Sequence, residues 1–336
     1  MLTAILTVLL FLILIIPHEF GHFIVAKLLG VQVNEFSVGM GPAIWQKQKG
    51  ETLYSLRAIP LGGYNALEGE NEESDNPRAF NNKSSLTKMA VLFAGGGMNV
   101  VFAAILMIVS ITISGIIVQP LSGVTPGSPA EQAGIQAGDR IVAINGTETD
   151  SWSSVVEEID KLEAGTPVPV VVLRDGTEHE LMISPVVDEE SQRVIIGVTA
   201  SVSHNPVRCV GYGIRATWEL NKAMLRAIGS MLAHGISKDD VSGPVGIVTL
   251  VNETSSYGID SFLYLAALIS LNLAIINLLP FPALDGGRII FVIIRKITGN
   301  MISDKVEGYV HTFGMALLLL LFLVVTWNDI AKLLIH

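Results

Sequence analysis

The sequence has a single cysteine, Cys209, and is poor in charged residues. One cysteine rules out an intramolecular disulfide and a cysteine-rich metal site. Of the 336 residues only 15% are charged and 50% are hydrophobic, and the mean hydropathy is +0.54. Soluble domains are more polar than this, so the composition predicts a membrane protein.

Basic residues are scarce in the middle of the chain. Residues 119–205 contain four of them, Arg140, Lys161, Arg174 and Arg193, against fourteen acidic residues. Nucleic-acid binding needs clustered Lys and Arg to displace phosphate counterions, so this segment is excluded as a nucleic-acid interface. We expect an acidic, solvated domain here.

Four hydrophobic segments are long enough to cross a bilayer, and they cover residues 2–28, 88–118, 261–283 and 308–328. The first has no Lys or Arg before Lys27 and no A-x-A cleavage site, which indicates a retained span rather than a signal peptide. The shorter apolar stretches 53–67 and 241–251 predict a membrane-associated hairpin or re-entrant pieces. The expected fold class is a polytopic α-helical membrane protein with about four transmembrane helices.

The positions of Lys and Arg predict how these spans are oriented. Basic residues gather after the first span and again after the third. The positive-inside rule places both of these segments in the cytoplasm. The N-terminus, residues 119–205 and the C-terminus are then expected outside.

The first span contains the sequence HEFGH at residues 18–22. In a helix, His18 and His22 lie one turn apart on one face, so both imidazoles can bind a single Zn²⁺ while Glu19 reaches a metal-bound water. Ionisable residues inside a span are costly and usually functional. The alternative is a coincidence of two core histidines, which rarely gives this spacing. The motif predicts hydrolysis with Zn²⁺ as cofactor, with the site near the cytoplasmic end of the span.

A carboxylate that can complete the site follows the third span. In NLLPFPALDGGR, residues 277–288, Pro280 and Pro282 break the helix and Asp285 comes after the last apolar residue. Taken alone, Asp-Gly is a common turn. Taken with HEFGH, Asp285 becomes the third ligand, because hydrolytic zinc sites usually have three protein ligands and leave a fourth position for water.

The segment 119–205 is predicted to be a small β-rich domain. Strand-like runs alternate with turn signals such as Asn145-Gly146, and residues 153–162 look helical. The string GVTPGSPAEQAGIQAGDRIVAINGTETDSW, residues 123–152, resembles the PDZ family. That resemblance implies a groove for a peptide or chain end, bound by β-augmentation. The alternative is a steric cover that keeps bulky ectodomains from the active site.

The motifs together resemble the site-2 protease family, in the bacterial branch of the regulator-of-sigma-E protease type. Beside HEFGH, the matching segments are FSVGMGP at 36–42, PLGGY at 60–64, SGPVG at 242–246 and NLLPFPALDGG at 277–287. The resemblance implies a zinc-dependent endopeptidase of the bacterial inner membrane that acts in regulated intramembrane proteolysis. Its implied partners are single-span membrane proteins, namely anti-sigma factors and remnant signal peptides, within the lipid bilayer.

The resemblance also implies residues that hold the substrate as an extended strand. These are Asn272 and Asn277, the breaks at Pro280 and Pro282, and a hairpin edge that contains Gly62 and Gly63. A substrate helix must unwind, and its freed backbone groups need new partners. Asn272 could equally bond to a neighbouring helix.

The chain departs from the family at Gly96, where a proline is usual. Glycines 95–97 still allow close approach to the zinc helix, and whether the second span bends there stays open.

We expect four regions along the chain. Residues 1–118 hold two spans, the zinc motif and a cytoplasmic-side hairpin; 119–205 form the PDZ-like domain; 206–260 form an amphipathic connector at the membrane surface; and 261–336 hold the last two spans. Two rival functions remain, a noncatalytic PDZ scaffold and a metal transporter. A transporter typically shows repeated halves with paired broken helices, and the sequence has no such repeat.

Overall fold

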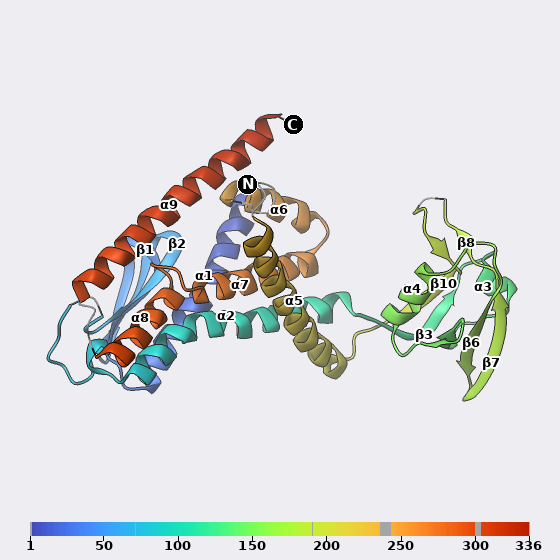
Figure 1. Cartoon of the computed structure of the whole chain (residues 1–336), viewed down its shortest axis with the longest axis horizontal. Helices are drawn as coiled ribbons and strands as arrows, with labels where there is room; N and C mark the ends of the chain where they lie inside the picture. Colours follow the sequence, from blue (N-terminus) through green and yellow to red (C-terminus); the bar gives the residue numbers. More distant parts are fainter. Residues whose placement is uncertain (1, 71, 190, 236–242, 300–303, 336) are drawn as a thin grey trace. The chain divides into compact units, whose positions relative to one another are not determined.

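The computed structural model describes residues 2–70, 72–189, 191–235, 243–299 and 304–335. The chain divides into two compact units. Unit 1 combines Met1–Ser110 with Gly211–His336, and unit 2 is Ile111–Val210 (Figure 1).

Unit 1 contains, among the described residues, four helices long and apolar enough to cross a membrane. They are α1 (Leu2–Leu28), α2 (Ser85–Ser114), α7 (Ile259–Leu278) and α9 (Asp304–Ile335). The hydropathy therefore predicts these four long apolar helices correctly, while some of their ends differ. The second ends at Ser114 rather than at 118, because residues 116–124 form a strand. The third ends at Leu278 rather than at 283, because Pro280 and Pro282 stop the helix.

These helices differ in how much of their apolar surface is buried. Central helix α7 buries Ala266, Ala267 and Leu271, whereas α9 exposes apolar side chains such as Leu319 and Leu323. Exposed apolar length of this kind suits contact with lipid.

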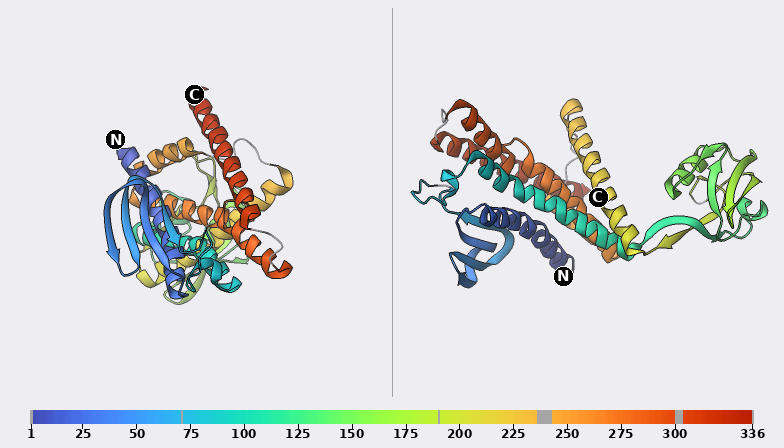
Figure 2. Two further views of the ribbon diagram at one scale, coloured as in Figure 1. Left: turned by 90° about the vertical axis from the view of Figure 1, so that its left-hand side faces the viewer. Right: turned by 90° about the horizontal axis from the view of Figure 1, so that it is seen from below.

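A curled hairpin lies against α1 (Figure 2). Its strands are β1 (Val33–Lys49) and β2 (Thr52–Leu67). The register shifts along the pair, so that residues 33–38 are paired with 63–67 and also with 53–56. Aromatic side chains fasten the hairpin to α1, since the ring of Phe23 lies 5.0 Å from that of Phe36 and 5.9 Å from that of Tyr54.

Charged hydrogen bonds join the hairpin turn to the end of α1. Glu51 accepts hydrogen bonds from Arg78 and from Lys27, at 2.6 Å each. These bonds lower the pKa of Glu51 to about 2. The expected hairpin at 53–67 is thus the second half of a longer one over residues 33–67.

Three further helices complete unit 1: α5 (Pro206–His234), α6 (Pro244–Ser256) and α8 (Asp285–Thr298). The stretch 241–251, expected as a re-entrant piece, falls mainly in α6, and its residues 241 and 242 lie outside the described part. Asp329 of α9 accepts a hydrogen bond from the Gly246 N–H at 2.8 Å and so holds the first turn of α6.

Helix α8 follows the third span, and charged residues suit both of its ends. Asp285 in its first turn and Arg295 and Lys296 in its last match the helix dipole. Gly299 ends α8 in the left-handed conformation, with φ +67°.

Unit 2 is a small β-rich fold with two short helices, α3 (Pro129–Gln132) and α4 (Trp152–Asp160). Its four-stranded sheet has the order β5 (Thr147–Glu148), β4 (Arg140–Ile144), β6 (Val168–Arg174), β7 (Thr177–Ile183). Two strand pairs accompany it, β3 (Ile116–Val124) with β10 (Val198–Ser203) and β8 (Val186–Val187) with β9 (Val194–Ile195). Strand β6 alternates buried and half-buried positions, and its Val170 and Val172 form the core with Ile141 of β4 and Val155 of α4, as a sheet packed on one face does.

Candidate metal centre

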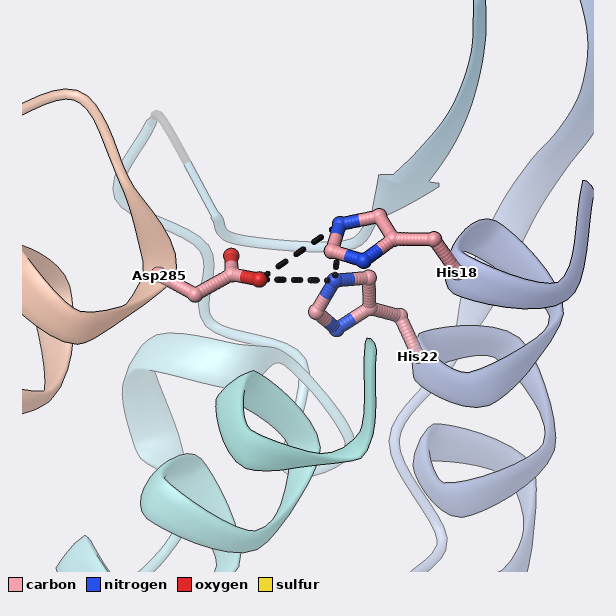
Figure 3. A group of neighbouring side chains, drawn as sticks. All are labelled: His18, His22 and Asp285. Atoms are coloured by element: carbon pink, nitrogen blue, oxygen red, sulfur yellow. Dashed lines mark hydrogen bonds and ion pairs between the residues drawn. The ribbon is translucent and has the colours of Figure 1, made fainter. Parts of the chain in front are cut away.

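Three side chains converge between α1 and the start of α8 (Figure 3). The Nε2 atoms of His18 and His22 lie 3.3 Å apart. Asp285 Oδ2 lies 3.5 Å from His18 Nε2 and 3.3 Å from His22 Nε2. One ligand atom of each residue lies within 4.8 Å of the others, and no second group of this kind occurs among the described residues.

The donor set fits a zinc ion. Two imidazole nitrogens and a carboxylate oxygen are common zinc ligands, and three of them leave a position for water. Asp285 Oδ2 is buried and accepts no hydrogen bond within the described part of the chain. A buried carboxylate oxygen aimed at two imidazole nitrogens is expected where a cation binds.

Contacts behind the histidines orient their rings. His22 Nδ1 lies 2.8 Å from the Val91 carbonyl oxygen and donates to it, which leaves Nε2 free to bind metal. The Asn277 amide lies 3.4 Å from His18 Nδ1. An amide rotation exchanges its nitrogen and oxygen, so Asn277 can also accept from the Nδ1–H that a metal-binding His18 carries.

Glycines form the wall of the site on α2. A β-carbon at position 95 would lie 2.3 Å from His22 Nε2 and 2.7 Å from His18 Cε1. On the facing helix, a β-carbon at position 21 would lie 2.3 Å from the Ala94 carbonyl oxygen. At Gly21 the backbones of α1 and α2 therefore approach each other closely, and at Gly95 the two imidazoles pack directly against α2. Helix α2 runs unbroken through Gly96, where the usual proline is absent.

The loop before Asp285 is held by the last span. Ala283 has φ +74°, which is unusual for a residue with a β-carbon. Its N–H donates to His311 Nδ1 at 2.8 Å. Gly314, one turn along α9, lets the helix approach Pro282, because a β-carbon there would lie 2.5 Å from Pro282 Cβ. This support by α9 depends on tertiary contacts that the sequence does not reveal.

Glu19 lies beside the histidines on α1 and contacts the hairpin. Its Oε2 and its main-chain oxygen each accept a hydrogen bond from Asn65 Nδ2 at 2.7 Å. A β-carbon at Gly63 would lie 3.2 Å from Glu19 Cγ. Sequence reasoning singled out Gly63 but missed Asn65, although it directly follows the PLGGY segment.

The other predicted substrate residues differ in their contacts and exposure. Gly62 has φ +98° and faces Met40 rather than Glu19, since a β-carbon there would lie 3.1 Å from Met40 Sδ. Asn272 is exposed on α7, and Pro280 is exposed in the loop that leads to α8. Asn277 lies within hydrogen-bonding distance of a metal-binding candidate, His18.

Two histidines and a carboxylate on packed helices, with a glutamate beside the first histidine, define a metalloprotease whose site lies among membrane-spanning helices. The chain belongs to peptidase family M50, whose model matches residues 6–321. It is a zinc-dependent intramembrane protease and a multi-pass membrane protein.

Relatives match it over nearly their whole length. A protein of Clostridium acetobutylicum is 36% identical, over 97% of this chain and 96% of its own. The zinc metalloprotease RasP of Oceanobacillus iheyensis is 30% identical, over 99% and 100%. The regulator of sigma-W protease RasP of Bacillus subtilis is 28% identical, over 98% and 99%. Among solved structures, the PDZ domain of an SdrC-like protein from Listeria monocytogenes covers 26% of this chain and 86% of that chain, with 21% identity and a TM-score of 0.23.

Proposed function

We propose that this protease cleaves the transmembrane segments of single-span membrane proteins with Zn²⁺ held by His18, His22 and Asp285. The observation that carries the proposal is the convergence of these three side chains, whose ligand atoms lie within 4.8 Å of one another. Glu19 acts as the general base in this proposal, because it lies next to the first ligand on α1 and its carboxylate lies at the hairpin edge, where Oε2 accepts a hydrogen bond from Asn65.

Each residue has a defined part in the hydrolysis. A zinc ion at this position supplies Lewis-acid activation of water and of the scissile carbonyl. Glu19 takes the proton from the attacking water and passes it to the leaving nitrogen. His22 keeps its orientation through the Val91 carbonyl, and His18 through Asn277.

The substrate binds as an extended strand along the edge of the hairpin. Residues 63–67 pair with 33–38 on one side, and this segment approaches α1 at Glu19 through Asn65. An unwound substrate would gain main-chain hydrogen bonds there that it loses from its own helix. Gly62 and Gly63 lack side chains at the start of this edge. By the family resemblance, we also assign substrate binding to Asn272 and Asn277 of α7 and to Pro280 and Pro282 in the loop that follows it.

The clients we infer are anti-sigma factors and remnant signal peptides. The name of the Bacillus subtilis relative, regulator of sigma-W protease, supports the first class. The chain would lie in the bacterial cytoplasmic membrane with both termini and residues 119–205 outside. The basic residues that follow α1 and α7 support this orientation and put the site toward the cytoplasmic side.

Residues 119–205 act as a PDZ-like domain that either binds a peptide end or screens the entrance. The SPA, AG, GD and ING elements support the PDZ assignment, with 1–118, 206–260 and 261–336 as the remaining regions. The two roles differ in their outcome when the domain is deleted. A screening domain would then admit substrates with bulky ectodomains, whereas loss of a recruiting domain would slow cleavage of the true substrate.

The first test is cleavage of a single-span protein by the purified full-length enzyme. We expect cleavage within the span by the wild type, and its loss both in Glu19→Gln and on addition of a zinc chelator. A wild type that binds zinc but leaves a panel of such substrates intact would instead favour a noncatalytic scaffold or a metal transporter.

A further inference from the structure

Asn65 is a polar residue of the hairpin whose side chain forms hydrogen bonds with Glu19, the proposed general base. Both of its side-chain hydrogen bonds among the described residues are donated from Nδ2 to Glu19, one to the main-chain oxygen and one to carboxylate Oε2. An amide nitrogen carries two hydrogens, so each bond can use one. We propose that Asn65 is a positioning residue that fixes the carboxylate of Glu19 relative to α1, an inference that rests on the proposed function.

The orientation of the amide is set by its partners. With its oxygen and nitrogen exchanged, Oδ1 would face two acceptor oxygens of Glu19 and make neither bond. Oδ1 is instead turned away, and it is buried without a hydrogen-bond partner in the described part of the chain. The side chain therefore contributes no hydrogen bond to the hairpin itself, as a residue with a purely structural role there would be expected to do.

Binding one main-chain atom and one side-chain atom of the same residue restricts the glutamate. The main-chain oxygen of Glu19 belongs to α1, so its bond fixes the Asn65 amide against the helix. The second bond then holds the carboxylate against that amide. A flexible side chain with three rotatable bonds is thus held in one orientation before substrate arrives, which is what general-base catalysis requires.

The hairpin is fastened independently of Asn65. Phe36, the register partner of Asn65, packs on Phe23 of α1 with ring centroids 5.0 Å apart. Glu70, just beyond the hairpin, forms an ion pair with Arg288 of α8. Because these contacts remain when the amide is removed, loss of Asn65 should disturb Glu19 and leave the hairpin and the metal ligands in place.

The test compares Asn65→Leu with Asn34→Leu. Asn34 Nδ2 donates to Glu68 Oε2 at 2.7 Å, which is the same kind of bond in the same hairpin but to a different glutamate. We expect Asn65→Leu to lower kcat by roughly 100-fold, the loss typical of a catalytic group misplaced by about 1 Å. KM and the zinc content should stay at the wild-type values, and Asn34→Leu should leave kcat unchanged.

Several results would overturn the inference while the proposed function stands. They are a wild-type kcat in Asn65→Leu, an equal loss in Asn34→Leu, or loss of bound zinc in Asn65→Leu. If Asn65→Leu does not fold, Asn65→Asp is the deciding variant, because it keeps the size of the side chain and removes both N–H donors. Asn65→Asp should also lower kcat at constant zinc content. A wild-type kcat in this variant would refute the positioning role. A wild type that cleaves nothing refutes the proposed function and this inference together.

Discussion

A methyl group added at position 95 should damage the metal centre without breaking the helix that carries it. The β-carbon of Gly95→Ala would lie 2.3 Å from His22 Nε2 and 2.7 Å from His18 Cε1. Unstrained contacts between such atoms are about 3.5 Å or longer, so the imidazoles or α2 must move by about 1 Å. A displacement of that size costs roughly 100-fold in rate, or about 2.7 kcal/mol in activation free energy.

Gly97→Ala provides the matched control on the same helix. Its β-carbon would lie 3.5 Å from Phe93 Cε1, an ordinary contact. Alanine is favoured over glycine in a helix interior by up to about 1 kcal/mol, a gain that applies to both variants. Gly97→Ala should therefore keep its activity. Gly95→Ala should lose activity although its substitution raises the helix propensity of α2 by the same amount.

The assay measures zinc content per protein, cleavage of a single-span substrate and helix content of the purified variants. We expect Gly95→Ala to retain helix content, to hold less zinc and to cleave roughly 100-fold more slowly. Full zinc occupancy with a wild-type rate would show that the glycine wall does not fix the histidines. An equal loss in Gly97→Ala would show that the effect belongs to the glycine run as a whole.

Two other predictions concern the third ligand and unit 2. Asp285→Asn should lower zinc retention as well as turnover, because a neutral amide is a poorer ligand than a carboxylate, and full zinc occupancy measured in that variant would contradict the assignment. In unit 2, hydrogen bonds from Arg174 lower the pKa of buried Asp139 below its ordinary value. The stabilisation from this pair should be complete above about pH 4, where the carboxyl is ionised in both folded and unfolded chains, and should be lost as the pH falls through the lowered folded pKa. Asp139→Asn should reduce stability by about 2 kcal/mol at neutral pH and flatten this acid dependence, as followed by unfolding of unit 2 at each pH.

The parts of the site that were predictable are those set by local spacing. His18 and His22 share a helix face wherever the helix forms, and the prolines that follow α7 mark its end. Asp285 needed a second motif to be singled out, because Asp-Gly alone reads as a turn. The structure makes it the first residue of α8 instead.

The parts that were missed depend on tertiary contacts. Asn65 meets Glu19 only because the register of the hairpin brings residues 63–67 to its edge and the aromatic cluster docks the hairpin on α1. The contact between His311 and the Ala283 N–H depends in the same way on how α9 packs. Asn65 and His311 do not lie at a fixed sequence spacing from the HEFGH motif, so no sequence pattern predicts their contacts.

The separation of the metal-binding candidates along the chain bears on how the protease is made. His18 and His22 lie in the first span, whereas Asp285 follows along the chain only after unit 2 and three of the four spans. A nascent chain thus carries two of the three ligands through most of its synthesis, and the carboxylate joins them only when α7 and α8 reach the bundle. We therefore expect the complete metal centre to form only once α7 and α8 have packed against α1.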